Sequence, residues 1–228
     1  MNNSRDKILG AVKDALRQPS HLPPTPQGVD ERIKEGLASV TPNDYVGLRE
    51  QFKKELELVS GEFQLVHSTD EIVTAVSRMM QESNYTSLTI AGDGPYDGIA
   101  QRVTEKNKAI QLVKASDYQK TERKEKLAAT EAALVDVNLA VADVASLALL
   151  YDDTPSSLPH FLPLTIFVVI KPEQLVANLF ELFEKLPAEK AKNMTLITGP
   201  SRTADVEKVL VLGAHGPKRL VVFMLEEN

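Results

Sequence analysis

Cysteine and tryptophan are both missing from the 228 residues of this chain. The absence of cysteine excludes disulfides, CxxC redox chemistry, a cysteine nucleophile and thiolate ligation of an iron–sulfur cluster. If the function involves electron transfer through such clusters, the clusters must lie on another chain.

Long apolar runs and a basic face are missing as well. No run reaches the roughly 18 apolar residues that a membrane-spanning helix needs, and no hydrophobic signal core follows the first residues. The net charge is −6, with Lys and Arg scattered among Asp and Glu, and the aromatic residues are only seven Phe and five Tyr. Nucleic-acid binding needs a basic face and, for single strands, aromatic platforms. We therefore expect a cytoplasmic protein with no membrane span and no nucleic-acid partner.

The remaining composition fits an α/β domain with a short appendage. Apolar residues make up 43% of the chain and charged residues 25%, which is ordinary for a globular protein. Residues 4–17 place apolar side chains at helical spacing, and residues 19–26 contain four prolines, which favour an extended linker. We predict an N-terminal helix and proline-rich linker over residues 1–26, followed by one α/β domain over residues 27–228.

Apolar periodicity predicts alternating strands and helices after the linker. Alternation of this kind favours a mainly parallel sheet flanked by helices. Helices are expected over 42–59, 68–80, 96–106 and 118–129, and from Pro172 onward; strands are expected over 63–66, 87–91, 110–113, 133–142, 146–150, 165–170, 194–197 and 220–225, with 133–142 and 146–150 paired.

The polar turn at residues 198–203 follows a predicted strand and is expected to open a short helix. A helix start presents free backbone N–H groups and the positive end of the helix dipole. Gly199 suits the turn, Ser201 and Thr203 can cap the helix or bind an oxyanion, and Arg202 has a planar fork suited to carboxylate or phosphate. Two acidic residues in the first helical turn would repel an anion. The segment fits either an anion site or simply a well-capped helix.

A second turn, between this helix and the last strand, holds His215 and Gly216. A histidine between small residues can act as acid, base or donor near neutral pH, or it can bond to backbone. The four histidines do not have the spacing of metal ligands, so no metal site is expected.

Gly92 and Asp143 complete the set of candidate ligand-binding residues. Gly92 follows a strand and precedes a helix, in a turn that resembles a phosphate loop only loosely because GxGxxG spacing is absent. Asp143 closes a strand and is either a turn residue or a ligand contact. Ligands of open α/β sheets gather beyond the carboxyl ends of the strands, where we expect both the Gly92 and the Gly199 loops.

Residues 198–207 and 212–217, in this order, resemble the C-terminal signature of the LUD (lactate utilization) domain family, and within it the lactate-utilization protein C group. The N-terminal helix and proline-rich linker are similar too. The resemblance implies a fold like that of the sugar-phosphate isomerases and CoA transferases. It also implies an accessory role in oxidation of L-lactate to pyruvate, beside iron–sulfur partner proteins, with no cofactor on this chain.

Two alternatives stay open. The chain could be an independent binder or enzyme for a phosphorylated, CoA-linked or carboxylate ligand, a small anion held at the candidate loops. It could also be a scaffold whose N-terminal helix docks a partner. No residue is assigned as catalytic.

The chain departs from the family pattern at one turn. The resemblance implies an acidic residue followed by Thr-Gly before a strand, whereas here Asp143 is followed by Val144 and Ala145. Glycine permits positive φ and close approach of a ligand, and alanine resists both. A family ligand site at this turn would therefore be weakened in this chain.

Overall fold

The computed structural model describes residues 7–10, 13, 44–92, 94–151, 158–186, 193–204, 210–212 and 216–227. Internal contacts divide the chain into two units, Met1–Leu37 and Ala38–Asn228. In the first unit, residues 7–10 and 13 are helical, which agrees with the helix expected over 4–17. The proline-rich linker and the predicted boundary after residue 26 lie outside the described residues.

The second unit is built on a parallel sheet, which confirms the expected α/β fold. Its strand order is β1-β12-β7-β4-β2-β3, and every neighbouring pair is parallel. The strands are β1 (Glu62–Val66), β2 (Ser87–Ile90), β3 (Gln111–Lys114), β4 (Ala132–Asp136), β7 (Thr165–Ile170) and β12 (Arg219–Leu225).

The central strands are buried on both faces. In β7, Phe167 and Val169 pack toward one face, whereas Ile166 and Val168 pack toward the other. Successive side chains of a strand point to opposite faces, so a strand covered on both sides must be apolar throughout. This is why the segment Thr165–Ile170 is an uninterrupted apolar and β-branched run with every residue buried.

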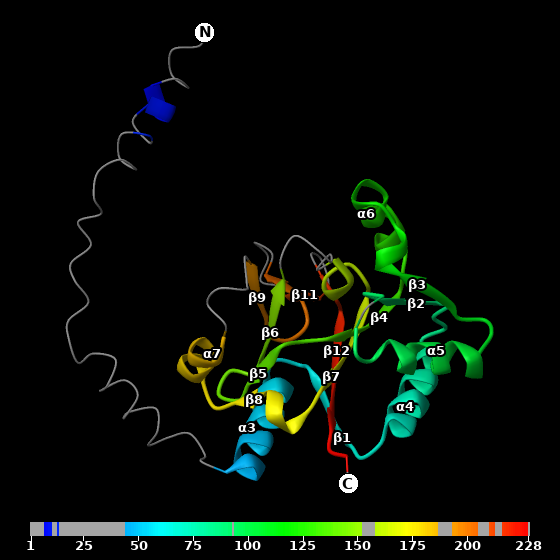
Figure 1. The fold of residues 1–228 in the computed structure, drawn as a ribbon, viewed down its shortest axis with the longest axis horizontal. Coiled ribbons are helices and arrows are strands. Elements are labelled where there is room, and N and C mark those ends of the chain that lie inside the picture. The colour runs from blue at the N-terminus through cyan, green and yellow to red at the C-terminus, as the bar shows by residue number, and fades with distance from the viewer. Residues whose placement is uncertain are drawn as a thin grey trace. The chain divides into compact units, whose positions relative to one another are not determined.

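Different layers cover the two faces. Helices α4 (Thr69–Glu82) and α5 (Asp97–Lys106) lie side by side on one face (Figure 1). Helix α3 (Tyr45–Leu58) and a second sheet cover the other face, and α6 (Lys120–Ala128) packs Leu127 against the end near β3. Helix α4 begins as its sequence predicts, because the Ser68 hydroxyl accepts a hydrogen bond from the Glu71 amide.

The second sheet has the order β8-β5-β6-β9, and a separate hairpin pairs β10 with β11. These strands are β5 (Leu139–Val141), β6 (Ser146–Tyr151), β8 (Leu175–Val176), β9 (Asn193–Ile197), β10 (Arg202–Ala204) and β11 (Leu210–Leu212). Helix α7 (Leu179–Lys185) covers the outer face of this sheet through Leu182.

The strand expected over 133–142 divides between the two sheets. Its first part is β4 of the parallel sheet, and only β5 pairs with β6. Asn138 lies at the break, where its backbone amide donates to the Ala148 carbonyl (2.9 Å) and its side-chain oxygen accepts from the Leu150 amide (2.6 Å). A side chain that replaces the backbone in the ladder lets the chain change sheets at this residue.

One predicted helix start is a strand instead, and another predicted helix begins later than expected. The segment after Gly199 forms strand β10 rather than a helix start, because its backbone pairs antiparallel with β11. The helix expected from Pro172 begins only at Leu179, where the Asn178 side chain accepts from the amides of Phe180 and Glu181. Pro172 instead starts a short 3₁₀ turn, Pro172–Gln174, which leads into β8.

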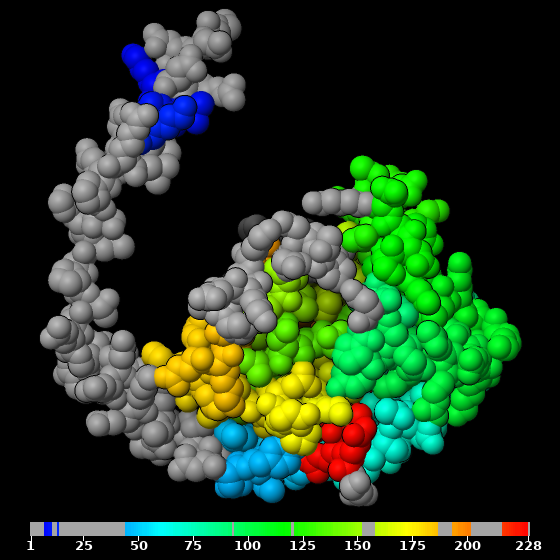
Figure 2. Space-filling model, viewed as in Figure 1, coloured from blue at the N-terminus to red at the C-terminus, as the bar shows by residue number. Residues whose placement is uncertain are grey.

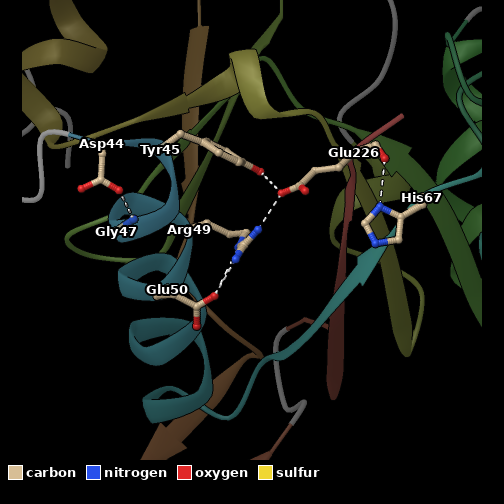
Figure 3. A network of polar contacts seen from close by, with 7 residues as sticks. All are labelled: Asp44, Tyr45, Gly47, Arg49, Glu50, His67 and Glu226. Atoms are coloured by element: carbon tan, nitrogen blue, oxygen red, sulfur yellow. Dashed lines mark hydrogen bonds and ion pairs between the residues drawn. The ribbon is translucent and has the colours of Figure 1, made fainter. Parts of the chain in front are cut away.

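A polar network ties α3 to the end of β12 (Figure 3). Glu226 accepts hydrogen bonds from the Tyr45 hydroxyl and from Arg49 Nη1 (2.9 Å), and its carbonyl lies 3.2 Å from His67 Nδ1. The hydrogen bond from Tyr45 lowers the pKa of Glu226, with Arg49 acting in the same direction. Burial and this carboxylate raise the pKa of Tyr45. The network therefore favours an ionised Glu226 beside a neutral Tyr45.

Candidate functional site

The sequence-predicted site residues do not form one site. His215 lies outside the described residues, and Arg202 and Thr203 are described only as backbone in β10. The others fall into two places. Gly92 lies at the carboxyl ends of the parallel strands. The second group lies toward their amino ends and consists of Asp143, Gly199, Ser201 and Gly216.

We call the second group, together with Ser146 and Thr198, the hairpin cluster. The hydroxyl oxygens of Ser146 and Thr198 lie 2.5 Å apart, which joins the β5–β6 turn to the Gly199 loop. The Ser201 amide donates to the Pro217 carbonyl at 2.8 Å, and a Cβ atom on Gly216 would lie 3.1 Å from Ser201 Cβ. Three segments distant in sequence therefore meet in this cluster.

Gly199 is required by the close packing of its loop on Val59, the residue that follows α3. Its φ is +81°, and an added Cβ atom would lie 2.8 Å from Val59 Cγ2 and 3.0 Å from the Val59 carbonyl oxygen. Only glycine adopts this conformation at so short a distance without strain. The packing explains this glycine without a ligand.

Asp143 is the cluster member with the strongest chemical character. It lies in the β5–β6 turn, where its amide donates to the Ala177 carbonyl at 3.1 Å. Its Oδ1 atom is buried and has no hydrogen-bond partner among the described residues. Burial, and then the negative charge of Glu55, raise the pKa of its carboxyl group. A carboxyl held toward its protonated form can donate a hydrogen bond or a proton.

The turn beside Asp143 keeps the backbone shape that glycine would favour. Ala145 has a φ of +46° and is fully buried. Its methyl group belongs to the core cluster that includes Leu147 and Ala142. At the position where the resemblance implies glycine, the turn thus has a left-handed conformation and a buried methyl group.

The hairpin cluster does not lie where the sequence predicts. Ser201 contacts Pro217, just before β12, and the Lys218 amide donates to the Leu164 carbonyl (2.8 Å), just before β7. These are the amino ends of the parallel strands. The expected position beyond the carboxyl ends is wrong for the Gly199 loop, because β9 belongs to the second sheet and runs antiparallel to β6.

Gly92 does lie at the carboxyl ends of the parallel strands. It has a φ of +108°, and an added Cβ atom would lie 2.0 Å from Ser116 Oγ, beyond the end of β3. Close by, a Cβ atom on Gly94 would lie 3.1 Å from Asp136 Oδ1, at the end of β4. The chain leaves β2 toward β3 over one face of the sheet and leaves β4 toward β7 over the other. Open α/β sheets bind ligands at such a reversal point.

A cleft of about 420 Å³ lies at the same edge, and we call it the carboxyl-edge cleft. Figure 2 shows the last described residues, coloured red, at the surface between the cyan start of α4 and the yellow segment that follows β7. This cleft could not be predicted from the sequence, because its residues come from separate segments with no shared motif. The lining includes Thr69, Tyr96, Arg102, Lys171, Leu225 and Glu227.

Among the described residues, no group of three His, Asp or Glu side chains is placed to hold a metal ion. No helix within the described ranges has the length and apolar character to cross a membrane.

The parallel sheet, its covering helices and the smaller second sheet define an α/β protein of the mainly parallel class. The LUD domain model matches residues 49–225, and the chain belongs to this family. The resemblance of the C-terminal segments is thus confirmed.

The relatives differ in how much of the chain they match. Uncharacterized protein YkgG of Escherichia coli is 23% identical over 235 residues, which cover 99% of each chain. Lactate utilization protein C of Bacillus pumilus is 35% identical over 75 residues, 30% of this chain and 31% of that protein. A crystal structure of a DUF162 family protein from Deinococcus radiodurans has a TM-score of 0.57 at 15% identity, and covers 81% of this chain and 99% of its own. At this identity the likeness concerns the fold alone.

Proposed function

We propose that this chain is an accessory subunit in L-lactate utilization and acts in the oxidation of L-lactate to pyruvate together with iron–sulfur partner proteins. Family membership over residues 49–225 carries the proposal. The partial similarity to a protein named for lactate utilization supports it.

The composition of the chain supports the assignment of the iron–sulfur clusters to partner proteins. Iron–sulfur clusters are held mainly by cysteine thiolates, and this chain has none. In the proposed complex the clusters belong to partner chains, and this subunit holds no cofactor of its own. A cytoplasmic location is part of the same proposal.

Deletion of the gene in the source organism tests the proposal. We expect growth on L-lactate as sole carbon source to fail while growth on glucose is unchanged, and expression of the full chain to restore it. Lysates of the deletion strain should also lose L-lactate-dependent reduction of an artificial electron acceptor. Normal growth and normal reduction without the gene would contradict the proposal.

Affinity purification of the tagged chain from lactate-grown cells tests the partnership separately. We expect cysteine-rich proteins and stoichiometric iron in the eluate. The two experiments can give different answers. If deletion impairs growth on lactate but the tagged chain copurifies with no iron-containing protein, the lactate role holds and the accessory-subunit role is rejected.

A second candidate function is that of an independent small-molecule binder or enzyme, for which the hairpin cluster is the favouring observation. Asp143 offers a carboxyl group of raised pKa three residues before Ser146, whose hydroxyl oxygen lies 2.5 Å from that of Thr198. If this cluster holds a ligand, the purified full chain should bind acetate or inorganic phosphate without any partner protein, and Asp143→Asn should change that affinity. Absence of binding by the wild-type chain, or equal affinity of the variant and wild type, would reject the second candidate.

A further inference from the structure

The carboxyl-edge cleft has the position and size of a small-molecule site. It lies where β7 and β12 end and where α4 and α5 begin. Its volume of about 420 Å³ falls in the range of typical ligand pockets. In open parallel sheets ligands gather at this edge, because the strands end there and the helices that follow them begin there.

Two cationic side chains of the cleft are held only weakly by the protein. Arg102 donates from Nη1 to the Thr69 hydroxyl (3.2 Å) and from Nη2 to the Asp70 carboxylate, which is 75% exposed. Lys171 Nζ lies 3.4 Å from a carboxylate oxygen of Glu227. Exposed ion pairs of this kind contribute little stability, so an anion with better geometry can replace the protein's own carboxylates.

The floor and the remaining wall of the cleft are apolar. Ile99 and Leu225 line it and are almost fully buried, and Pro95 adds a further apolar surface. Since Ile99 and Leu225 are already buried, the hydrocarbon surface that a ligand can remove from water belongs mainly to the exposed Pro95 and the half-buried Tyr96.

The surrounding charges limit the charge that a ligand can carry. Burial raises the pKa of Tyr96 to about 12, and the negative charges of Asp136, Glu173 and Glu227 act in the same direction. Tyr96 thus presents a neutral hydroxyl at neutral pH. These three acidic groups and Asp70, which pairs with Arg102, outnumber the two cations, so repulsion grows with each negative charge on a ligand. A singly charged anion is tolerated better here than a phosphate dianion or a polyphosphate.

We propose that the carboxyl-edge cleft binds a small organic monocarboxylate, with the carboxylate between Arg102 and Lys171 and the apolar part against Pro95 and Tyr96, next to the buried Ile99 and Leu225. This site is separate from the hairpin cluster, and it does not require the lactate role or any partner protein.

Titration of the full ¹⁵N-labelled chain with 4-methylvalerate, acetate and inorganic phosphate tests the proposal. We expect saturable shifts of the amide signals of Gly98, Ile99 and Leu225 with 4-methylvalerate. Acetate should bind more weakly because it lacks the apolar body, and phosphate should bind more weakly because of its second charge. Absence of saturable shifts at these amides, or tighter binding of phosphate, would overturn the proposal.

A matched pair of arginine variants locates the charge contact. Arg102→Gln should weaken 4-methylvalerate binding about tenfold or more, the usual effect of losing a charge-assisted contact. Arg78→Gln removes the same charge from α4 outside the cleft, where Arg78 is 61% exposed and pairs with Glu82 at 3.5 Å, and it should leave the dissociation constant unchanged. Equal constants for the two variants would refute the site. Lys171→Gln is an independent test. It should also lower the affinity for 4-methylvalerate, and unchanged affinity would contradict the placement of the carboxylate between Arg102 and Lys171.

Discussion

Two buried threonines of the parallel sheet should respond in opposite directions to the same substitution. Thr89 in β2 and Thr165 in β7 are 0% and 1% exposed. Thr89 Oγ1 has no hydrogen-bond partner among the described residues, whereas Thr165 Oγ1 lies 3.2 Å from the Tyr85 hydroxyl. Valine replaces the hydroxyl with a methyl group of nearly the same volume in a strand that suits both residues.

The local environment of each hydroxyl sets the expected magnitudes. A buried hydroxyl without a partner costs about 1–3 kcal/mol, so Thr89→Val should raise the free energy of unfolding by about 1–2 kcal/mol. Thr165→Val removes a hydrogen bond and leaves the Tyr85 hydroxyl to find water, so it should lower that free energy by about 0.5–1.5 kcal/mol. The two variants should therefore differ by about 1.5–3.5 kcal/mol.

Urea denaturation followed by far-ultraviolet circular dichroism measures this difference. The chain has no tryptophan, so a backbone signal is the appropriate probe. With equal m-values, the order of midpoints should be Thr89→Val above wild type and wild type above Thr165→Val. If Thr89→Val destabilises as much as Thr165→Val, then the Thr89 hydroxyl has a partner, such as a buried water, and the reasoning fails.

Four further substitutions test features near the candidate sites. Gly199→Ala should lower the free energy of unfolding by about 2 kcal/mol or more, because alanine is strained at positive φ and would overlap Val59, and an unchanged melting temperature would contradict this. Asp143→Asn should be more stable than wild type at neutral pH, because a raised carboxyl pKa means that wild-type stability is lost as the pH rises through that pKa. This advantage should vanish below about pH 4, and a constant difference across the pH range would argue against the assigned burial. Glu226→Gln should behave oppositely, because the lowered pKa of Glu226 stabilises the wild type above the ordinary glutamate pKa. The variant should therefore be less stable than wild type at neutral pH and equally stable in acid. Tyr45→Phe should reduce this pH dependence of stability.

Local patterns predicted much of the architecture. The buried run of β7 and the Ser68 cap of α4 are each specified within a few neighbouring residues. Capping and periodicity act over short distances, so they can be recognised before the fold is known. The family could likewise be inferred from contiguous segments near the end of the chain.

Strand partners were decided by tertiary contacts. The segment after Gly199 has no local feature that favours a hairpin over a capped helix, and its pairing with β11 settled the outcome. The break at Asn138 depends on hydrogen bonds to Ala148 and Leu150, which belong to a later strand. The amino-edge position of the hairpin cluster follows from these pairings.

The candidate sites show most clearly which features the sequence determined and which the tertiary structure determined. Apolar periodicity and turn residues, read from the sequence alone, determined the parallel sheet and the Gly92 turn at its carboxyl edge. The sequence also determined the family. Only the tertiary structure brought Thr69, Arg102, Lys171 and Leu225 together into one cleft, and only it separated Gly92 from Gly199. The physical reason is that side chains converge through the packing of distant strands and helices, which no local spacing encodes.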